Sequence, residues 1–209
     1  MNKKLSFGEP FLETRYLEAE ESYAVTGSVI LINIDDAEDI LVNGEFHLPA
    51  LQSMIVRNAV INVPAKALLV IGAEHIDLND RECLTSLLAS WKSNYQLTGN
   101  PAMKNVPFFK SPQEIIDGIT INFCLVADPA SPSGIHREHG KPVHELHVQI
   151  SGNGAVDLMK SADPSSCYAS IPLAPGSTHM HTWDNEGVYP WHRYRSVDRC
   201  LFLAVSIEA

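Results

Sequence analysis

Residues 136–147 read H-R-E-H-G-K-P-V-H-E-L-H, which places four histidines and two glutamates in twelve positions. Residues 174–181 read A-P-G-S-T-H-M-H and add two more histidines behind a Pro-Gly turn. Seven of the nine histidines of the chain lie between His136 and His192. Because imidazole and carboxylate groups are the usual protein ligands of Zn, Fe, Mn, Ni and Cu, this clustering predicts a metal site.

Residues 143–150 follow the alternating pattern of a strand whose two faces meet different surroundings. Glu145 and His147 are two residues apart, so both side chains project to the same side of this strand. His179 and His181 have the same spacing on a later predicted strand. Two such pairs facing each other across a barrel would supply three or four ligands to one metal ion.

Most of the remaining chain also predicts strands. Short runs rich in β-branched residues alternate with turn residues, and Asn43-Gly44 is a strong hairpin signal. The longest predicted strands are residues 28–34, 54–63, 67–72, 119–126, 155–159, 168–173, 177–183 and 199–207. Pro64 is expected to separate the second of these from the third. Strands of this length and spacing predict a mainly β fold, either a sandwich or a barrel.

One or two short helices are predicted among the strands. Asp80 is a suitable N-cap for a helix over residues 80–95, which carries apolar residues at helical spacing. The sequence Ser111-Pro112-Gln113-Glu114 matches a capping box and predicts a short helix that ends near Gly118. Residues 95–110 lack a clear period and are interpreted as a connector.

The second predicted helix marks the best candidate for a domain boundary. We expect an N-terminal β-rich region over residues 1–110 and a second unit over residues 111–209. Residues 1–22 are polar and acidic and stay unassigned, as an arm or a short helix.

The second half of the chain resembles the cupin superfamily, the RmlC-like β-barrels of jelly-roll type. The first cupin motif is G-x5-H-x-H-x(3,4)-E-x6-G, and its end is matched by Glu145 and Gly152. The second motif is G-x5-P-x-G-x2-H-x3-N, and its centre is matched by Gly176-Ser-Thr-His179. The resemblance covers about residues 118–207. It implies a double-stranded β-helix barrel in the C-terminal half.

The first histidine motif departs from the family pattern. Counting back from Glu145, only His139 stands where a motif histidine is expected, and Lys141 occupies the place of the other. Either the loop is longer and His136 contributes, or the set of ligands is altered. The N-terminal region carries neither motif. It is interpreted either as a degenerate second barrel or as a sheet extension that covers the barrel or exchanges across a dimer.

The resemblance implies a metal held by two imidazoles and one carboxylate. We expect His139, Glu145 and His179 as the metal ligands, with His147, His181 and His136 as further candidates. Fe(II) is the favoured ion, and Zn, Mn, Ni and Cu are alternatives.

Two further groups of residues are assigned by their chemistry. Residues suited to moving a proton are His147, His181 and Tyr194. Residues suited to contacting a substrate are Gln149, Trp191, His192 and Arg193. For Arg193 this role is pairing with a carboxylate. The alternative is that the aromatic residues of 188–194 fill the barrel or a dimer interface.

The overall charge narrows the class of partner. The formal charge is −10 and the pI about 5.3, which argues against a nucleic-acid or anionic-membrane partner. The longest apolar runs are too short to span a bilayer, and the N-terminus does not read as a secretory signal. The four cysteines form no C-x-x-C pair. These features predict a cytoplasmic protein with a small-molecule substrate, and a homodimer is the default for a cupin.

Three functions remain open at this stage. The leading hypothesis is a small metal-dependent cupin enzyme, with oxygen-dependent, dioxygenase-like chemistry favoured. The second is an isomerase or lyase that uses a histidine base, with or without a metal. The third is a cupin that binds a small sugar or acid without catalysis. Fold resemblance does not choose among them.

Overall fold

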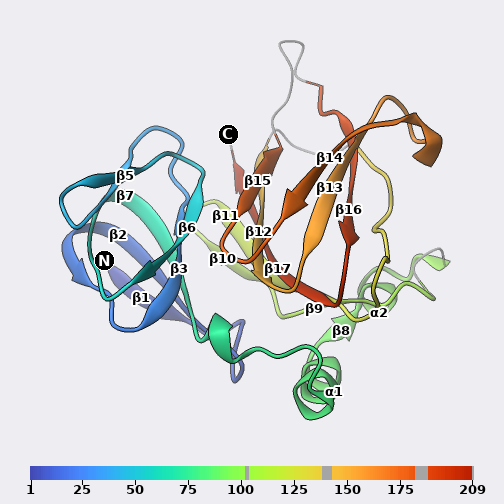
Figure 1. The fold of residues 1–209 in the computed structure, drawn as a ribbon, viewed down its shortest axis with the longest axis horizontal. Coiled ribbons are helices and arrows are strands. Elements are labelled where there is room, and N and C mark those ends of the chain that lie inside the picture. Colours follow the sequence, from blue (N-terminus) through green and yellow to red (C-terminus); the bar gives the residue numbers. More distant parts are fainter. Residues whose placement is uncertain (102–103, 138–142, 182–187, 209) are drawn as a thin grey trace.

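The computed structural model describes residues 1–101, 104–137, 143–181 and 188–208. The protein is mainly β, as the sequence predicts. An N-terminal sheet lies beside a C-terminal pair of sheets, and a helix projects at one end of the molecule (Figure 1). None of the helices in the described part of the chain has the length and apolar character needed to cross a membrane.

Seven antiparallel strands form the N-terminal sheet, in the order β1-β2-β7-β3-β6 with β4 beside β5 and β7. Their bounds are β1 (Asn2–Leu5), β2 (Glu13–Ala24), β3 (Ser28–Asn33), β4 (Ile40–Val42), β5 (Phe46–Leu48), β6 (Ser53–Arg57) and β7 (Val60–Ile71). The N-terminal segment is therefore two strands, neither an arm nor a helix. The expected break at Pro64 is wrong, because β7 passes through it where the register with β2 shifts. An irregular site of this kind tolerates a residue that has no N–H group.

The first predicted helix is present as α1 (Arg81–Ser90), and the Asp80 side chain caps it by accepting from the Cys83 N–H at 2.7 Å. The connector interpretation of residues 95–110 is wrong. The chain forms β8 (Lys92–Ser93), then α2 (Asn94–Thr98), and later β9 (Phe108–Lys110). A capping box between Ser93 and Gln96 fixes the start of α2. The described part of the chain also includes the 3-10 helices η1 (Ala73–His75) and η3 (Pro164–Ser166).

The second predicted helix is wrong as well. Strand β10 (Glu114–Ile116) forms a hairpin with β11 (Ile119–Val126) around Asp117-Gly118. Both turn residues have positive φ, 48° and 76°, and such Asp-Gly turns match the twist of a hairpin. Ser111 serves the sheet instead of a helix, because its hydroxyl accepts from the Phe123 N–H at 2.9 Å. The Asp-Gly turn signal, which begins three residues after the end of the capping-box pattern, therefore decides the local structure.

The C-terminal half forms two antiparallel sheets. The larger has the order β15-β12-β17-β11-β9-β8, with β10 beside β11, and the smaller has the order β14-β13-β16. The new strands are β12 (Val143–Ser151), β13 (Gly154–Met159), β14 (Cys167–Leu173), β15 (Thr178–His181), β16 (Trp191–Ser196) and β17 (Cys200–Glu208). Two isolated bridges, Pro132 to Arg195 and His136 to His192, lay the segment before β12 along the free side of β16.

The order in which the chain visits these sheets defines their topology. From β11 it crosses to the segment along β16, returns to β12, and enters the smaller sheet at β13 and β14. Then β15, β16 and β17 alternate between the larger and the smaller sheet. The seven strands β11 to β17 and the segment along β16 thus fill eight positions in two sheets. This arrangement is a jelly roll, the fold class predicted from the sequence.

Three clusters of buried apolar residues hold the sheets together. One fills the space between the two sheets of the jelly roll, and another lies within the N-terminal region. The third joins the N-terminal sheet and α1 to the outer face of the larger barrel sheet. Leu146, Val148 and Ile150 of β12 belong to this third cluster, so the alternate residues of β12 face the barrel interior. The division at residue 110 stays a prediction, and β8 and β9, which precede it, pair into the barrel sheet.

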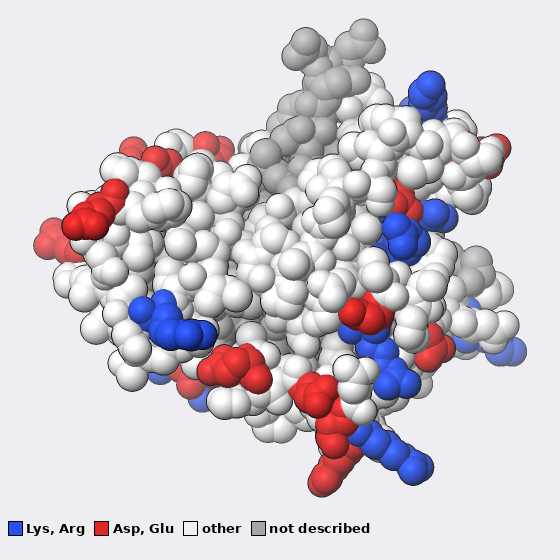
Figure 2. Space-filling model, viewed as in Figure 1, with Lys and Arg blue, Asp and Glu red and all other residues white. Residues whose placement is uncertain are grey.

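The charges lie mainly at the periphery. On the face drawn in Figure 2, the described Lys and Arg side chains are scattered, several of them beside acidic groups, and form no continuous basic patch. This distribution agrees with the acidic composition.

Candidate metal centre

Strand β12 carries Glu145 and His147 on the face that looks into the barrel. It lies between β15 and β17, and its register with β15 sets Glu145 opposite His181 and His147 opposite His179. Opposite residues of an antiparallel pair project to the same side of the sheet. The two pairs recognised in the sequence therefore belong to adjacent positions of one sheet.

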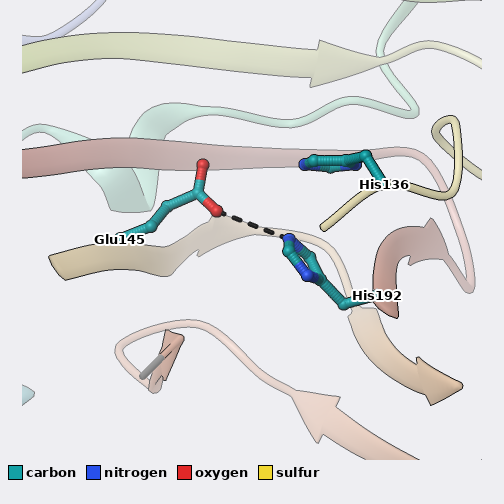
Figure 3. A group of neighbouring side chains, drawn as sticks. All are labelled: His136, Glu145 and His192. Carbon is teal, nitrogen blue, oxygen red and sulfur yellow. Dashed lines mark ion pairs between the residues drawn. The ribbon is translucent and has the colours of Figure 1, made fainter. Parts of the chain in front are cut away.

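Two further histidines come from the smaller sheet. His136 and His192 face each other in an antiparallel bridge, and each backbone N–H donates to the other carbonyl, at 3.0 and 2.9 Å. Glu145 points toward both rings from the larger sheet (Figure 3). One ligand atom from each of His136, Glu145 and His192 lies within 4.8 Å of the other two. This spacing suits three ligands around one ion, because bonds of about 2.0–2.2 Å place ligand atoms roughly 3–4 Å apart.

Backbone carbonyls orient both imidazoles. The Nδ1 atom of His136 lies 3.0 Å from the Gly134 carbonyl oxygen, and that of His192 lies 2.8 Å from the Pro190 oxygen. Since a carbonyl oxygen only accepts, each contact requires a proton on Nδ1. In the neutral ring the lone pair is then on Nε2, and the Nε2 atom of His192 lies 3.6 Å from Glu145 Oε2. A ring whose Nδ1 is bound by a backbone carbonyl, and whose Nε2 lone pair is left for the site, is typical of metal-binding histidines.

Burial keeps the surrounding imidazoles neutral. Burial lowers the pKa of His147 to about 4, although the Glu145 carboxylate, whose Oε1 lies 3.8 Å from His147 Nε2, opposes the shift. The pKa values of His136 and His179 are also lowered, in each case mainly by burial. A neutral imidazole has the lone pair that a metal needs. The lowered pKa values of His136, His147 and His179 are therefore compatible with a role as metal ligands.

A cavity of about 390 Å³ opens beside these groups. His136, Glu145 and His147 line it together with the aromatic rings of Phe108, Tyr194 and Phe202. Its polar lining also includes Asn94, Asn100, Lys110 and Ser133. A volume of this size accommodates a small organic molecule.

A jelly roll whose interior carries a histidine and glutamate cluster is the arrangement that the sequence motifs predict. The C-terminal half has the cupin fold. Solved structures similar to this chain include a cupin superfamily protein from Desulfitobacterium hafniense, with 13% identity, coverage of 51% of this chain and 80% of that one, and a TM-score of 0.36. A cupin 2 conserved barrel domain protein from Leptotrichia buccalis has 8% identity, coverage of 100% and 88%, and a TM-score of 0.37.

An RmlC-like cupin protein from Desulfovibrio desulfuricans is similar at 15% identity, with coverage of 45% of this chain and 76% of that one, and a TM-score of 0.35. No family model matches the sequence, and no curated protein matches it. The assignment of the fold therefore rests on the strand order of the barrel, and the activity has to be argued from the site.

The cupin barrel brings together only part of the predicted ligand set. Glu145 is in the cluster, and His136, a reserve candidate, takes part with His192, which the sequence suggested as a substrate contact. His179 lies on β15, and it interacts electrostatically with Glu145 and His192. His139 lies outside the described residues, and for His181 the structure describes the strand position alone. The set of His139, Glu145 and His179 stays a prediction.

Three of the predicted substrate contacts lie on β16 with Tyr194, and these four residues divide between the two faces of the strand. His192 and Tyr194 point into the barrel and are buried. Trp191 and Arg193 project from the outer face, where the Arg193 Nε donates to Asp157 Oδ2 at 3.0 Å and Arg137 stacks 4.9 Å from the Trp191 ring. The structure thus places these two residues away from the cavity, with Arg193 paired to a carboxylate of the protein itself.

Tyr194 and Gln149 are joined inside the barrel. The Tyr194 hydroxyl donates to Gln149 Oε1 at 2.8 Å and lies 3.1 Å from Cys200 Sγ. Burial is the main cause that raises the Tyr194 pKa well above its ordinary value. The amide nitrogen of Gln149 donates to the carbonyls of Ser151 and Gly152. These contacts fix the Tyr194 ring as part of the cavity wall, while its predicted role in proton transfer stays a prediction.

Sequence reasoning missed one part of the cavity wall. Asn100, Phe108 and Lys110 belong to residues 95–110, which the sequence suggested as a connector, and Asn94 comes directly before them. The capping box at Ser93 was the available signal, because it predicts an ordered turn at this position.

Proposed function

We propose that this protein is a small metal-dependent cupin enzyme that acts on a small organic molecule in the barrel cavity. The observation that carries the proposal is the cluster of His136, Glu145 and His192, whose ligand atoms lie within 4.8 Å of one another beside the cavity of about 390 Å³. Two imidazoles and one carboxylate are a common ligand set of divalent transition metals.

The donor set of the site fits such an ion. Packing alone does not explain why a carboxylate and several imidazoles share the interior of a barrel, because burying polar groups is costly. The positive charge of a divalent ion would offset the cost of burying the Glu145 carboxylate. His147, whose Nε2 lies 3.8 Å from Glu145 Oε1, and His179, which interacts electrostatically with Glu145 and His192, are the candidates for a further ligand or a hydrogen-bonding neighbour.

Fe(II) is the ion we favour, with Zn, Mn, Ni or Cu as alternatives. An Fe(II) ion held by two histidines and one carboxylate would supply open coordination positions and a redox centre for oxygen-dependent chemistry. The chain would contribute a cavity with aromatic walls, and imidazoles held in a fixed orientation by backbone carbonyls. A dioxygenase-like reaction is therefore our preferred activity.

Elemental analysis of protein purified without a metal-affinity tag tests the metal. We expect close to one equivalent of a transition metal in the wild type and a loss of metal in Glu145→Gln and His192→Ala. His75→Ala is the matched control, because the His75 side chain is 80% exposed and lies outside the cluster. Equal metal content in all four proteins, or no metal after reloading with each candidate ion, would refute the proposal.

Oxygen consumption tests the preferred activity. Metal-depleted protein reloaded with Fe(II) should consume oxygen when it turns over a small-molecule substrate found by screening, and protein reloaded with Zn should not. Full turnover under strict anaerobiosis would instead indicate the isomerase or lyase alternative.

A further inference from the structure

Lys110 lies where two hollows of the molecule meet. It lines the barrel cavity, and it also lines a neighbouring groove of about 450 Å³ beneath α2. Asn94 is the other residue that the two hollows share. The groove and the cavity are thus adjacent, and Lys110 and Asn94 form part of the wall of both.

The register of β9 directs Lys110 toward the barrel interior. Lys110 is opposite Cys124 of β11, and Phe108 is opposite Val126. Cys124 and Val126 are buried in the apolar cluster between the two barrel sheets. Because opposite residues in an antiparallel pair project to the same side, Lys110 starts on the interior face of the sheet. Its ammonium lies 5.9 Å from the centre of the Phe108 ring.

The charge around Lys110 is unusual for this acidic protein. Among the described residues that line the cavity, Lys110 is the only Lys or Arg. On its other side it is opposite Lys92 of β8, so two like charges face each other across the strands. None of the ion pairs between described residues includes either lysine. Because Lys110 takes part in none of these ion pairs, its ammonium at the cavity wall is suited to receive an anion from outside the chain.

We propose that the barrel cavity takes a small organic anion, a monocarboxylate with an apolar body, whose carboxylate pairs with the Lys110 ammonium. The apolar body lies against the rings of Phe108 and Phe202, which are 6.0 Å apart between centroids. This assignment of substrate class rests on the proposed function, because it takes the cavity beside the His136, Glu145 and His192 cluster to be the active site.

The chemistry of the cavity favours this class over a neutral substrate. A lysine ammonium in a partly desolvated wall forms charge-assisted hydrogen bonds with a carboxylate, which are stronger than bonds between neutral groups. The only carboxylate in the described cavity lining is Glu145, which belongs to the candidate metal cluster. A metal there would offset the Glu145 charge and leave Lys110 to set the preference for an anion.

Binding of phenylacetate and of its neutral analogue phenylacetamide tests the proposal. Isothermal titration calorimetry and ligand-observed NMR would measure both dissociation constants in the wild type, Lys110→Met, Lys110→Arg and Lys92→Met. Lys92→Met is the matched control, because it removes the same charge from an exposed residue that lines only the outer groove. Metal content is measured on each sample.

The wild type and Lys92→Met should bind phenylacetate about tenfold or more tightly than phenylacetamide, as a charge-assisted hydrogen bond predicts. Lys110→Met should lose this preference, and Lys110→Arg should keep most of it. Equal binding of the two probes by the wild type, no detectable binding of phenylacetate, or an equal loss in Lys92→Met would overturn the proposal. If phenylacetate selectivity is absent while the metal is retained, the substrate class fails and the metal-dependent function stands. If metal is absent while the selectivity for phenylacetate is present, the metal-dependent function fails and the substrate class stands.

Discussion

His136 and His192 are hydrogen-bonded to each other through their backbones, and their rings lie 4.4 Å apart between centroids. The bridge joins the segment before β12 to β16, so two parts of the chain that are 56 residues apart meet at one position of the smaller sheet. Glu145 faces them from the larger sheet (Figure 3). The candidate metal centre therefore depends on the two sheets being held at a fixed separation.

Substitutions of His192 and His147 should distinguish a metal ligand from a residue that only supports a ligand. We expect His192→Ala to abolish stoichiometric metal binding, because it removes an imidazole of the cluster. His147→Gln should weaken metal binding by about 10–100-fold if His147 only supports Glu145 from 3.8 Å. Competition with a fluorescent chelator would measure both affinities. Equal losses in the two variants would show that His147 is itself a ligand.

The hydroxyl of Tyr194 should matter more for stability than for chemistry. Tyr194→Phe removes the donor to Gln149 Oε1 inside the barrel, and a buried hydrogen bond of this kind contributes about 1 kcal/mol. We expect a corresponding decrease in the free energy of unfolding, measured by urea denaturation. Turnover should change less than about tenfold. A loss of turnover above hundredfold at unchanged stability would support the predicted role of Tyr194 in moving a proton.

The start of β15 is braced by the N-terminal sheet. Ser53 donates to the Gly176 carbonyl at 2.8 Å and contacts Thr178, and a Cβ on Gly176 would lie 2.6 Å from Ile55 Cγ1. Gly176 also has a φ of +86°, which L residues rarely adopt. Gly176→Ala should therefore lower the free energy of unfolding by about 1–3 kcal/mol.

Gly176→Ala should also weaken metal binding, because His179 follows three residues later on β15. Gly27→Ala is the control for the strain alone. Gly27 has a φ of +75°, but a Cβ there meets nothing within 4 Å. A Gly27→Ala variant as unstable as Gly176→Ala would show that contact with the N-terminal sheet is unimportant.

The stability that Asp157 contributes should depend on pH in acid. Burial raises the pKa of Asp157, but hydrogen bonds from Ser170, Arg195 and Arg193 outweigh it and hold the pKa below its ordinary value of 3.8. The unfolded chain therefore takes up the proton first. The stabilisation is full above pH 3.8 and is lost as the pH falls through the lower pKa of the folded state.

Asp157→Asn should lower the free energy of unfolding by about 2 kcal/mol at pH 7, since it removes charge-assisted hydrogen bonds from a buried carboxylate. The difference from the wild type should shrink below pH 3.8. Urea titrations at pH 7 and at pH 3 would measure both values. A difference that stays constant between the two would contradict the assignment of the network.

The sequence by itself determined the mainly β class, the helix capped by Asp80, and the placing of Glu145 and His147 on one strand face. These features depend on local spacing, capping and alternation, which the backbone imposes on any chain. The same local reasoning failed at Ser111-Pro112-Gln113-Glu114. A capping-box pattern and an Asp-Gly hairpin turn competed there, and pairing with β11 favoured the turn.

Only the tertiary structure decided which histidines meet Glu145. His192 reaches the cluster because β16 pairs with β13 in the smaller sheet, and His136 joins it through the bridge to His192. Neither relationship leaves a spacing signal in the sequence, since the partners are far apart along the chain. The place of Lys110 in the cavity wall likewise follows from the pairing of β9 with β11. The alternation of residues along each strand thus specified which of its faces is polar. The order of strands in the barrel determined which polar faces lie opposite one another.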